Sequence, residues 1–240
     1  MKTKVWTISI RIFHWLLAIG FASAYILSDF DNYQNLHYAF GLFVGVLIFF
    51  RIIYGFIGNK YANFKDFPIN IKNQISFITH FFKKDNTYIG HNPAASIVMI
   101  GIFIVGLFCS ISGYMLYSAE NPSFINISKS EDFLEETHEI LANLFLGLVI
   151  IHLIGIFTDL LFHSKTKTLQ SIFTGYKSVE AENAKQNIFQ TIFSVLWFIV
   201  PFLAFIYGTN LKSESDTEKN HIEQNKKQRE EHNEHDEYDD

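Results

Sequence analysis

Five long apolar segments constrain the fold of this chain, because each is long enough to cross a bilayer as an α-helix. A bilayer core offers no water to bond the backbone, so a spanning segment of this length must satisfy its own N–H and C=O groups as a helix. The segments are residues 8–27, 36–57, 94–117, 136–162 and 188–207. We therefore predict an all-α membrane protein, with a four-helix bundle and one additional C-terminal transmembrane helix.

Composition divides the chain into three parts. Residues 1–178 hold the predicted bundle, and residues 179–210 hold the additional transmembrane helix. Residues 211–240 contain eleven Asp and Glu side chains, five Lys and Arg side chains and almost no apolar ones. Such a composition predicts a charged, disordered tail. The rest of the chain is nearly neutral, which argues against a nucleic-acid partner.

Charges in the predicted loops indicate an orientation. Lysines dominate the N-terminus and the loops at 58–93 and 163–187, whereas acidic residues dominate the loops at 28–35 and 118–135. The positive-inside rule then places the N-terminus of this predicted multi-pass membrane protein in the cytoplasm. Within the second loop, residues 67–82 have helical apolar spacing among lysines, which predicts a short helix on the inner membrane surface.

Four histidines in the predicted spans fall at two depths. His138 and His152 lie fourteen residues apart, about four helical turns, so both leave one face of the fourth span. The orientation puts His14 at the depth of His152, and His37 at the depth of His138. Facing imidazoles on two helices can fill both axial positions of a haem iron. We therefore predict iron ligation by the pairs His14/His152 and His37/His138, although any one histidine alone is more typical of helix packing.

Small residues follow two of these histidines at four-residue steps. They are Ala18 and Ala22 after His14, and Gly41 and Gly45 after His37. A face of this kind leaves room for a flat porphyrin beside the helix. Ordinary small-residue packing between membrane helices explains the glycines equally well.

Three further basic side chains are candidates for cofactor contacts near the inner membrane surface. Arg11 and Arg51 can pair with the propionate carboxylates of a haem, or they can extend to the lipid headgroups. His91 is a candidate for a propionate or quinone contact, or it is an ordinary loop histidine. The single cysteine, Cys109, excludes an intrachain disulfide and a CxxCH haem attachment, so any haem is held non-covalently.

Several short motifs occur in a fixed order between residues 5 and 178. They are Arg11–Trp15 (RIFHW), Leu36–Gly41 (LHYAFG), Phe49–Gly58 (FFRIIYGFIG), Gly90–Pro93 (GHNP), His138–Asn143 (HEILAN) with His152, and Phe173–Lys177 (FTGYK). In these motifs the chain resembles the bacterial cytochrome b561 / nickel-iron hydrogenase b-type cytochrome family. The resemblance ends near residue 180, so it assigns no role to the fifth span or the tail.

The resemblance implies a membrane core that binds two non-covalent b-type haems through His14, His37, His138 and His152. It also implies electron transfer in a respiratory chain, between the quinone pool and a partner, either a c-type cytochrome or a hydrogenase. Quinone is a further candidate cofactor. The resemblance also implies that the bundle lies in the lipid of the bacterial cytoplasmic (inner) membrane. An alternative is a self-contained quinone-linked oxidoreductase acting on a small oxidant such as superoxide. A third hypothesis, haem or metal handling, rests on the tail histidines His221, His232 and His235.

Overall fold

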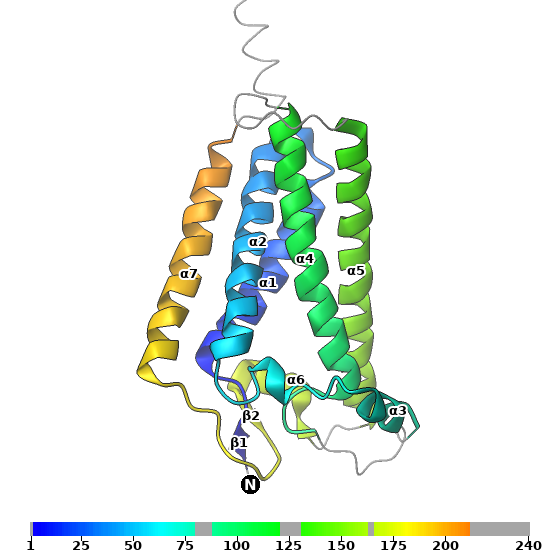
Figure 1. The fold of residues 1–240 in the computed structure, drawn as a ribbon, viewed down its shortest axis with the longest axis vertical. Helices are drawn as coiled ribbons and strands as arrows, with labels where there is room; N and C mark the ends of the chain where they lie inside the picture. The colour runs from blue at the N-terminus through cyan, green and yellow to red at the C-terminus, as the bar shows by residue number, and fades with distance from the viewer. Residues whose placement is uncertain (1, 80–87, 121–130, 163–165, 212–240) are drawn as a thin grey trace, which may run out of the picture.

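The structure of the chain, a computed structural model, describes residues 2–79, 88–120, 131–162 and 166–211. Within these ranges five helices are long and apolar enough to cross a membrane. They are α1 (Ile8–Leu27), α2 (Gln34–Ile57), α4 (Pro93–Glu120), α5 (Glu131–Phe162) and α7 (Ile188–Thr209). The five run side by side in an elongated bundle (Figure 1). The predicted all-α membrane fold is confirmed, while residues 212–240, which hold the tail histidines, lie outside the described residues.

Four of the five helices extend beyond the predicted apolar segments. The largest difference is in α5, which begins at Glu131 instead of at residue 136. Its first turn contains Glu131 and Asp132. Carboxylates there interact favourably with the positive end of the helix dipole. The helix therefore begins in the acidic residues that precede the apolar segment.

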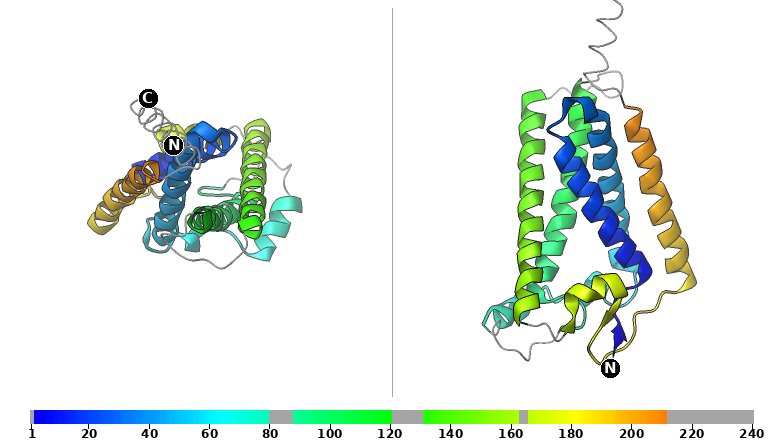
Figure 2. Two further views of the ribbon diagram at one scale, coloured as in Figure 1. Left: turned by 90° about the horizontal axis from the view of Figure 1, so that it is seen from above. Right: turned by 180° about the vertical axis from the view of Figure 1, so that it is seen from behind.

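Short elements gather at one end of the bundle, called here the lower end as it appears in Figure 1. They are β1 (Thr3–Lys4), η2 (Phe64–Asp66), α3 (Ile71–Thr79), α6 (Thr168–Thr174) and β2 (Tyr176–Lys177). The strands β1 and β2 pair antiparallel, with Thr3 opposite Lys177. The short helix η1 (Asp31–Tyr33) and the first turn of α5 lie at the opposite, upper end (Figure 2).

The predicted surface helix at 67–82 is present as α3, but it begins four residues later, at Ile71. Pro68 lies in the segment before it, and the Asn70 side chain accepts a hydrogen bond of 2.7 Å from the backbone N–H of Lys72. An asparagine that bonds in this way caps a helix N-terminus. Residues 80–82 of the prediction lie outside the described residues.

Gly175 joins the N-terminus to the segment after α5. It has φ of +87° at the end of α6, a conformation that suits glycine because other residues are strained there. Its carbonyl accepts hydrogen bonds from the backbone N–H groups of Val5 (2.8 Å) and Trp6 (3.1 Å). This turn holds the start of α1 against α6 and β2, which brings Trp6 and Lys177 together.

The fifth helix packs along α2. The buried Trp197 side chain of α7 donates a 3.0 Å hydrogen bond to the carbonyl of Leu47. Gly208, nearer the upper end, lies so close to α2 that a Cβ atom there would stand 2.4 Å from the Cα of Ala39. At the lower end, Gln190 donates to the Ile57 carbonyl (2.9 Å) and forms a capping box with Asn187. The additional helix is therefore an integral part of the bundle.

Replacement of Trp197 tests the packing of α7. We expect Trp197→Ala to lower stability by about 3–5 kcal/mol, because it opens a cavity and leaves the Leu47 carbonyl without its donor. Thermal unfolding of the purified protein in detergent measures the loss. Ile199→Ala is the matched control, because that side chain is 50% exposed in the same helix. Equal destabilisation by both substitutions would contradict the packing described here.

Candidate functional site

The structure brings the four span histidines together in the two predicted combinations. His14 of α1 faces His152 of α5 near the lower end, with ring centres 6.4 Å apart. His37 of α2 faces His138 of α5 near the upper end, with ring centres 6.1 Å apart. These are called the lower pair and the upper pair. Both lie between helices, and α5 contributes one ring to each.

The ring separations fit one metal ion between the members of each pair. An imidazole nitrogen lies about 2 Å from a metal ion that it binds, and the ring centre lies about 1 Å further away. Two rings on opposite sides of one ion therefore have centres roughly 6 Å apart. Both observed separations are close to this value, as expected for the two axial ligands of a haem iron.

Hydrogen bonds orient both rings of the upper pair. The Nδ1 of His37 lies 2.8 Å from the Ala24 carbonyl, and the Nδ1 of His138 lies 3.1 Å from the Cys109 carbonyl. A carbonyl only accepts, so the Nδ1 of His37 carries the proton. The Ser112 hydroxyl lies 3.0 Å from the Nδ1 of His138, but it donates its own proton to the Cys109 carbonyl (2.9 Å), so the Nδ1 of His138 is also the donor. The Nε2 of each ring keeps a free lone pair. Histidines that bind a metal ion commonly donate their other ring N–H to a carbonyl in this way. The sequence did not predict the contact between the Cys109 carbonyl and His138, because helix patterns do not reveal backbone contacts between spans.

In the lower pair, His14 has no hydrogen bond of this kind among the described residues. Its Nδ1 is inaccessible to solvent and has no hydrogen-bond partner within the described ranges. A buried imidazole nitrogen without a partner carries a desolvation penalty of about 1–3 kcal/mol. The upper and lower pairs therefore share a ring separation but differ in how their rings are oriented.

A cavity of about 270 Å³ adjoins the upper pair. His37, His138, Gly41 and Gly113 line it, together with Glu135 at the start of α5. Its volume is close to the lower end of the range for ligand sites, roughly 300–1,000 Å³. Added Cβ atoms distinguish the two glycines: one at Gly41 meets nothing within 4 Å, whereas one at Gly113 would lie 2.8 Å from the His138 ring.

The two small-residue interpretations each hold for one glycine of α2. Gly41 borders the cavity, as expected for a face that receives a planar ligand. Gly45 instead contacts α4, because a Cβ there would lie 2.5 Å from the Ser110 side chain. Close helix packing therefore explains Gly45, and ligand space explains Gly41.

An aromatic contact separates the upper pair from the lower pair. Phe21 of α1 and Phe145 of α5 have ring centres 4.3 Å apart. Phe145 lies seven residues from both His138 and His152, which is about two helical turns, so all three share one face of α5. Gly106 of α4 leaves room for this ring, because a Cβ there would lie 2.9 Å from it.

Arg11 and Arg51 lie near the lower end but differ in their surroundings. Arg11 donates to the Phe173 carbonyl of α6, and its Nε has no partner within the described ranges. Arg51 is only 1% exposed, so it does not extend to lipid headgroups. Its guanidinium donates a 3.1 Å hydrogen bond to the Ala62 carbonyl.

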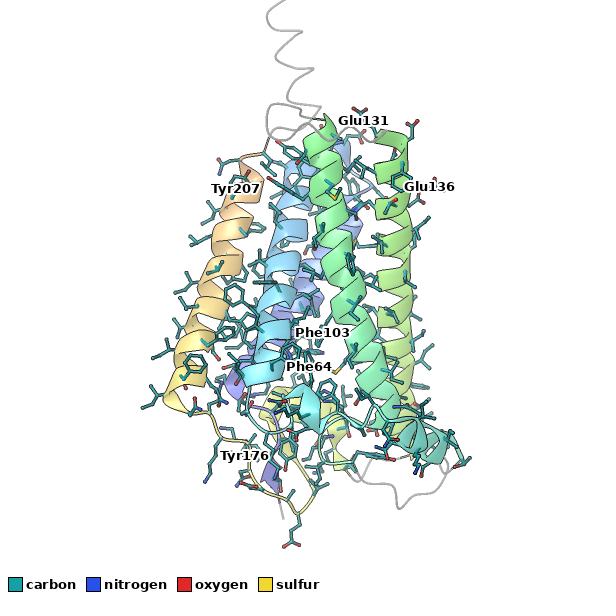
Figure 3. The ribbon with its side chains drawn as sticks, viewed as in Figure 1. Phe64, Phe103, Glu131, Glu136, Tyr176 and Tyr207 are labelled. Carbon is teal, nitrogen blue, oxygen red and sulfur yellow. The ribbon has the colours of Figure 1, made fainter. Side chains whose placement is uncertain are left out.

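Three aromatic rings surround the Arg51 guanidinium. They belong to Phe13, Phe64 and Phe103, at 6.0, 5.5 and 5.1 Å from its central carbon. Phe64 and Phe103 are labelled together near the lower ends of α2 and α4 in Figure 3. Each cation–π contact of this kind contributes about 0.5–2 kcal/mol, so three rings together offset part of the several kcal/mol that burial of an ion costs. They supply no anionic acceptor for the guanidinium N–H donors.

His91 lies just before α4, between the rings of Trp6 and Phe67, each 4.7 Å from it. Its Nδ1 is inaccessible to solvent and has no hydrogen-bond partner among the described residues. Burial, and then the charges of Lys177 and Arg51, lower the pKa of His91 well below its ordinary value. The ring is therefore neutral near pH 7, and it is not an ordinary exposed loop histidine.

Lys177 is a buried cation that the sequence analysis missed as a site residue. It is 3% exposed, and its Nζ donates to the carbonyls of Gly90 (2.8 Å) and Tyr88 (3.3 Å). Burial lowers the pKa of Lys177 to about 8, so the ammonium remains mostly charged at pH 7. The FTGYK motif contained this lysine, but a loop lysine is more often solvated, and only the fold shows its burial.

Comparisons with known proteins agree with this arrangement. The family described as prokaryotic cytochrome b561 matches residues 5–175, which include both histidine pairs. No solved structure gives a significant match.

Curated relatives match part of the chain. A "probable Ni/Fe-hydrogenase 1 B-type cytochrome subunit" of Escherichia coli (strain K12) is 27% identical over 135 residues, 45% of this chain and 57% of the relative. A "probable Ni/Fe-hydrogenase B-type cytochrome subunit" of Rhizobium leguminosarum bv. viciae is 25% identical over 48% of this chain and 59% of the relative. The chain thus spans less than two thirds of these relatives' length.

The family match covers most of the chain, and it agrees with five apolar helices and with histidine rings spaced for axial ligation. A b-type cytochrome holds haem b as its cofactor. The chain is a multi-pass membrane protein and belongs to the prokaryotic cytochrome b561 family.

Proposed function

We propose that this protein is a membrane dihaem cytochrome that transfers electrons between the quinone pool and a partner redox protein. The observation that carries the proposal is the pair of ring separations, 6.4 and 6.1 Å, at two depths of one bundle. His14 and His152 hold one haem b, and His37 and His138 hold the other. When bound, these haems supply reversible one-electron chemistry at iron.

The chain's own residues then set the conditions for that chemistry. Each ligating imidazole stays neutral and presents its Nε2, while the Ala24 and Cys109 carbonyls fix the upper rings through Nδ1. His14 with His152, and His37 with His138, would each hold one haem iron through two protein ligands, which would disfavour oxygen binding. The apolar helices exclude water from the space between the pairs, and Phe21 with Phe145 fills that space.

We further propose that the lower end faces the cytoplasm and that the membrane is the bacterial cytoplasmic membrane. The lysine-rich loops at that end support this orientation. Residues 1–178 are the haem-binding unit, and residues 179–210 add a helix to it. The names of the relatives favour a hydrogenase as the partner, and a c-type cytochrome is the second candidate. Arg11 and Arg51 near the lower haem, and His91 beside them, are its proposed cofactor contacts.

Single replacements of the ligands test the two sites. We expect His14→Ala or His152→Ala to remove one haem, and His37→Ala or His138→Ala to remove the other, because each iron loses an axial ligand. Haem-to-protein ratios and reduced-minus-oxidised spectra of the purified variants measure this. The double variant His14→Ala/His152→Ala should lose no more than either single one. Loss of different haems from the two members of one pair would contradict the pairing.

A glycine beside the upper pair provides an independent test. We expect Gly113→Val to lower the occupancy of the upper haem alone, because a Cβ there would lie 2.8 Å from the His138 ring and displace it. Absorbance spectra resolve which haem is lost. Gly147→Val in α5 is the control, because a Cβ at Gly147 meets nothing within 4 Å. Retention of both haems in Gly113→Val would refute the position assigned to His138.

Direct reduction tests the proposed electron transfer. We expect a quinol analogue to reduce both haems in the purified protein, and a partner isolated with it under mild detergent to exchange electrons with them. Stopped-flow absorbance at the haem bands follows both reactions. Reduction by dithionite without any reduction by quinol, in the presence of both haems, would exclude quinol as the donor.

A further inference from the structure

Basic side chains cluster at the lower end without an ion-pair partner among the residues that the structure describes. Arg51 and Lys177 are both almost fully buried, and the His91 ring is close enough to both for their charges to act on it. Within the described ranges the one ion pair joins Lys60 to Glu182, so no carboxylate lies within salt-bridge distance of either buried cation. Asp159 of α5 attracts the Lys177 charge only from a longer distance. Buried charges are normally paired.

The cluster also has unused hydrogen-bond donors. The Nη1 of Arg51 is inaccessible to solvent and has no partner in the described part of the chain, while Nη2 donates to Ala62. An ammonium has three N–H donors, and carbonyls accept two of those on Lys177. The Nδ1 of His91 has no partner among the described residues, and it is a donor in the tautomer that carries its proton there. Buried donors that remain available on cations are the groups that bind a carboxylate.

The position of the cluster points to the lower pair. Arg51 lies fourteen residues after His37 on α2, about four turns, so it shares the His37 face at the depth of the opposite end. The ring of Phe13, next to His14 in sequence, contacts the Arg51 guanidinium. The charge of His152 also acts on the His91 ring. The cluster therefore lies at the end of the bundle that holds the lower pair.

We propose that Arg51, Lys177 and His91 form a buried anion site beside the lower pair, and that its ligand is a carboxylate of the haem held there. This inference rests on the proposed function. Haem b carries two propionate carboxylates, which extend from one edge of the ring. The site gives them two cations and a neutral imidazole, and Lys177 is the residue that completes it.

Redox titration of the full-length protein tests the site. We expect Lys177→Met to shift the midpoint potential of the lower haem to a more negative value and to leave the upper haem unchanged. The reason is that a nearby cation favours the reduced form, which carries one positive charge fewer. His14→Ala identifies which midpoint belongs to the lower haem. Lys177→Arg, which keeps the charge, should retain most of the wild-type midpoint.

Controls separate this shift from a general structural effect. Lys72→Met in α3 removes an exposed lysine from the same end of the molecule and should leave both midpoints unchanged. If Lys177→Met does not accumulate, Lys177→Gln removes the charge and keeps a donor for the Gly90 carbonyl, and the same shift is expected. Arg51→Lys should give a smaller shift of the same haem.

Different results would overturn the proposed function and the anion site. A wild-type protein without haem would overturn the proposed function itself. A wild-type protein with two haems whose midpoints are the same in Lys177→Met would overturn only the anion site. A raised KM for quinol with unchanged midpoints would also overturn it, because that result assigns the cluster to quinone.

Discussion

Four imidazoles inside an apolar bundle impose the constraint on which the rest of this structure depends. Each ring has two nitrogens, and lipid-facing helices offer few partners for them. Carbonyls of Ala24 and Cys109 accept a hydrogen bond from one nitrogen on each upper ring, and they leave the Nε2 of each ring with a free lone pair. On the proposed function, a haem iron would accept the lone pairs of each pair of rings. The bundle would then hold one iron at each of two depths.

The position of α5 follows from the same constraint. Its backbone packs closely against α4, whereas its contacts with α1 and α2 are made mainly by side chains. His138, Phe145 and His152, spaced by seven residues, form one face that meets His37, Phe21 and His14. The Phe21–Phe145 contact closes the middle of this face. The two pairs therefore share one helix and are separated by an aromatic contact.

Periodicity and charge made much of this predictable. The fourteen-residue spacing of His138 and His152 fixed a common face, and the alternation of loop charges fixed the depth of His14 and His37. Contacts between distant backbone segments were not predictable, because no side-chain pattern records them. The Cys109 carbonyl on His138 is one example. The burial of Lys177 is another, since it depends on the Gly175 turn that joins β2 to the N-terminus.

The electrostatic surroundings of the two pairs differ. Arg51 and Lys177 lie buried near the lower pair, whereas the nearest charge lining the upper cavity is Glu135, which is exposed and screened by solvent. On the proposed assignment, the buried cations favour an electron on the lower haem. In the proposed orientation the lower end faces the negative side of the membrane, where moving an electron inward costs about 2.3 kcal/mol per 100 mV. The two buried charges therefore offset part of the cost of moving an electron inward. On this assignment, electrons that enter at the upper haem can reach the lower one.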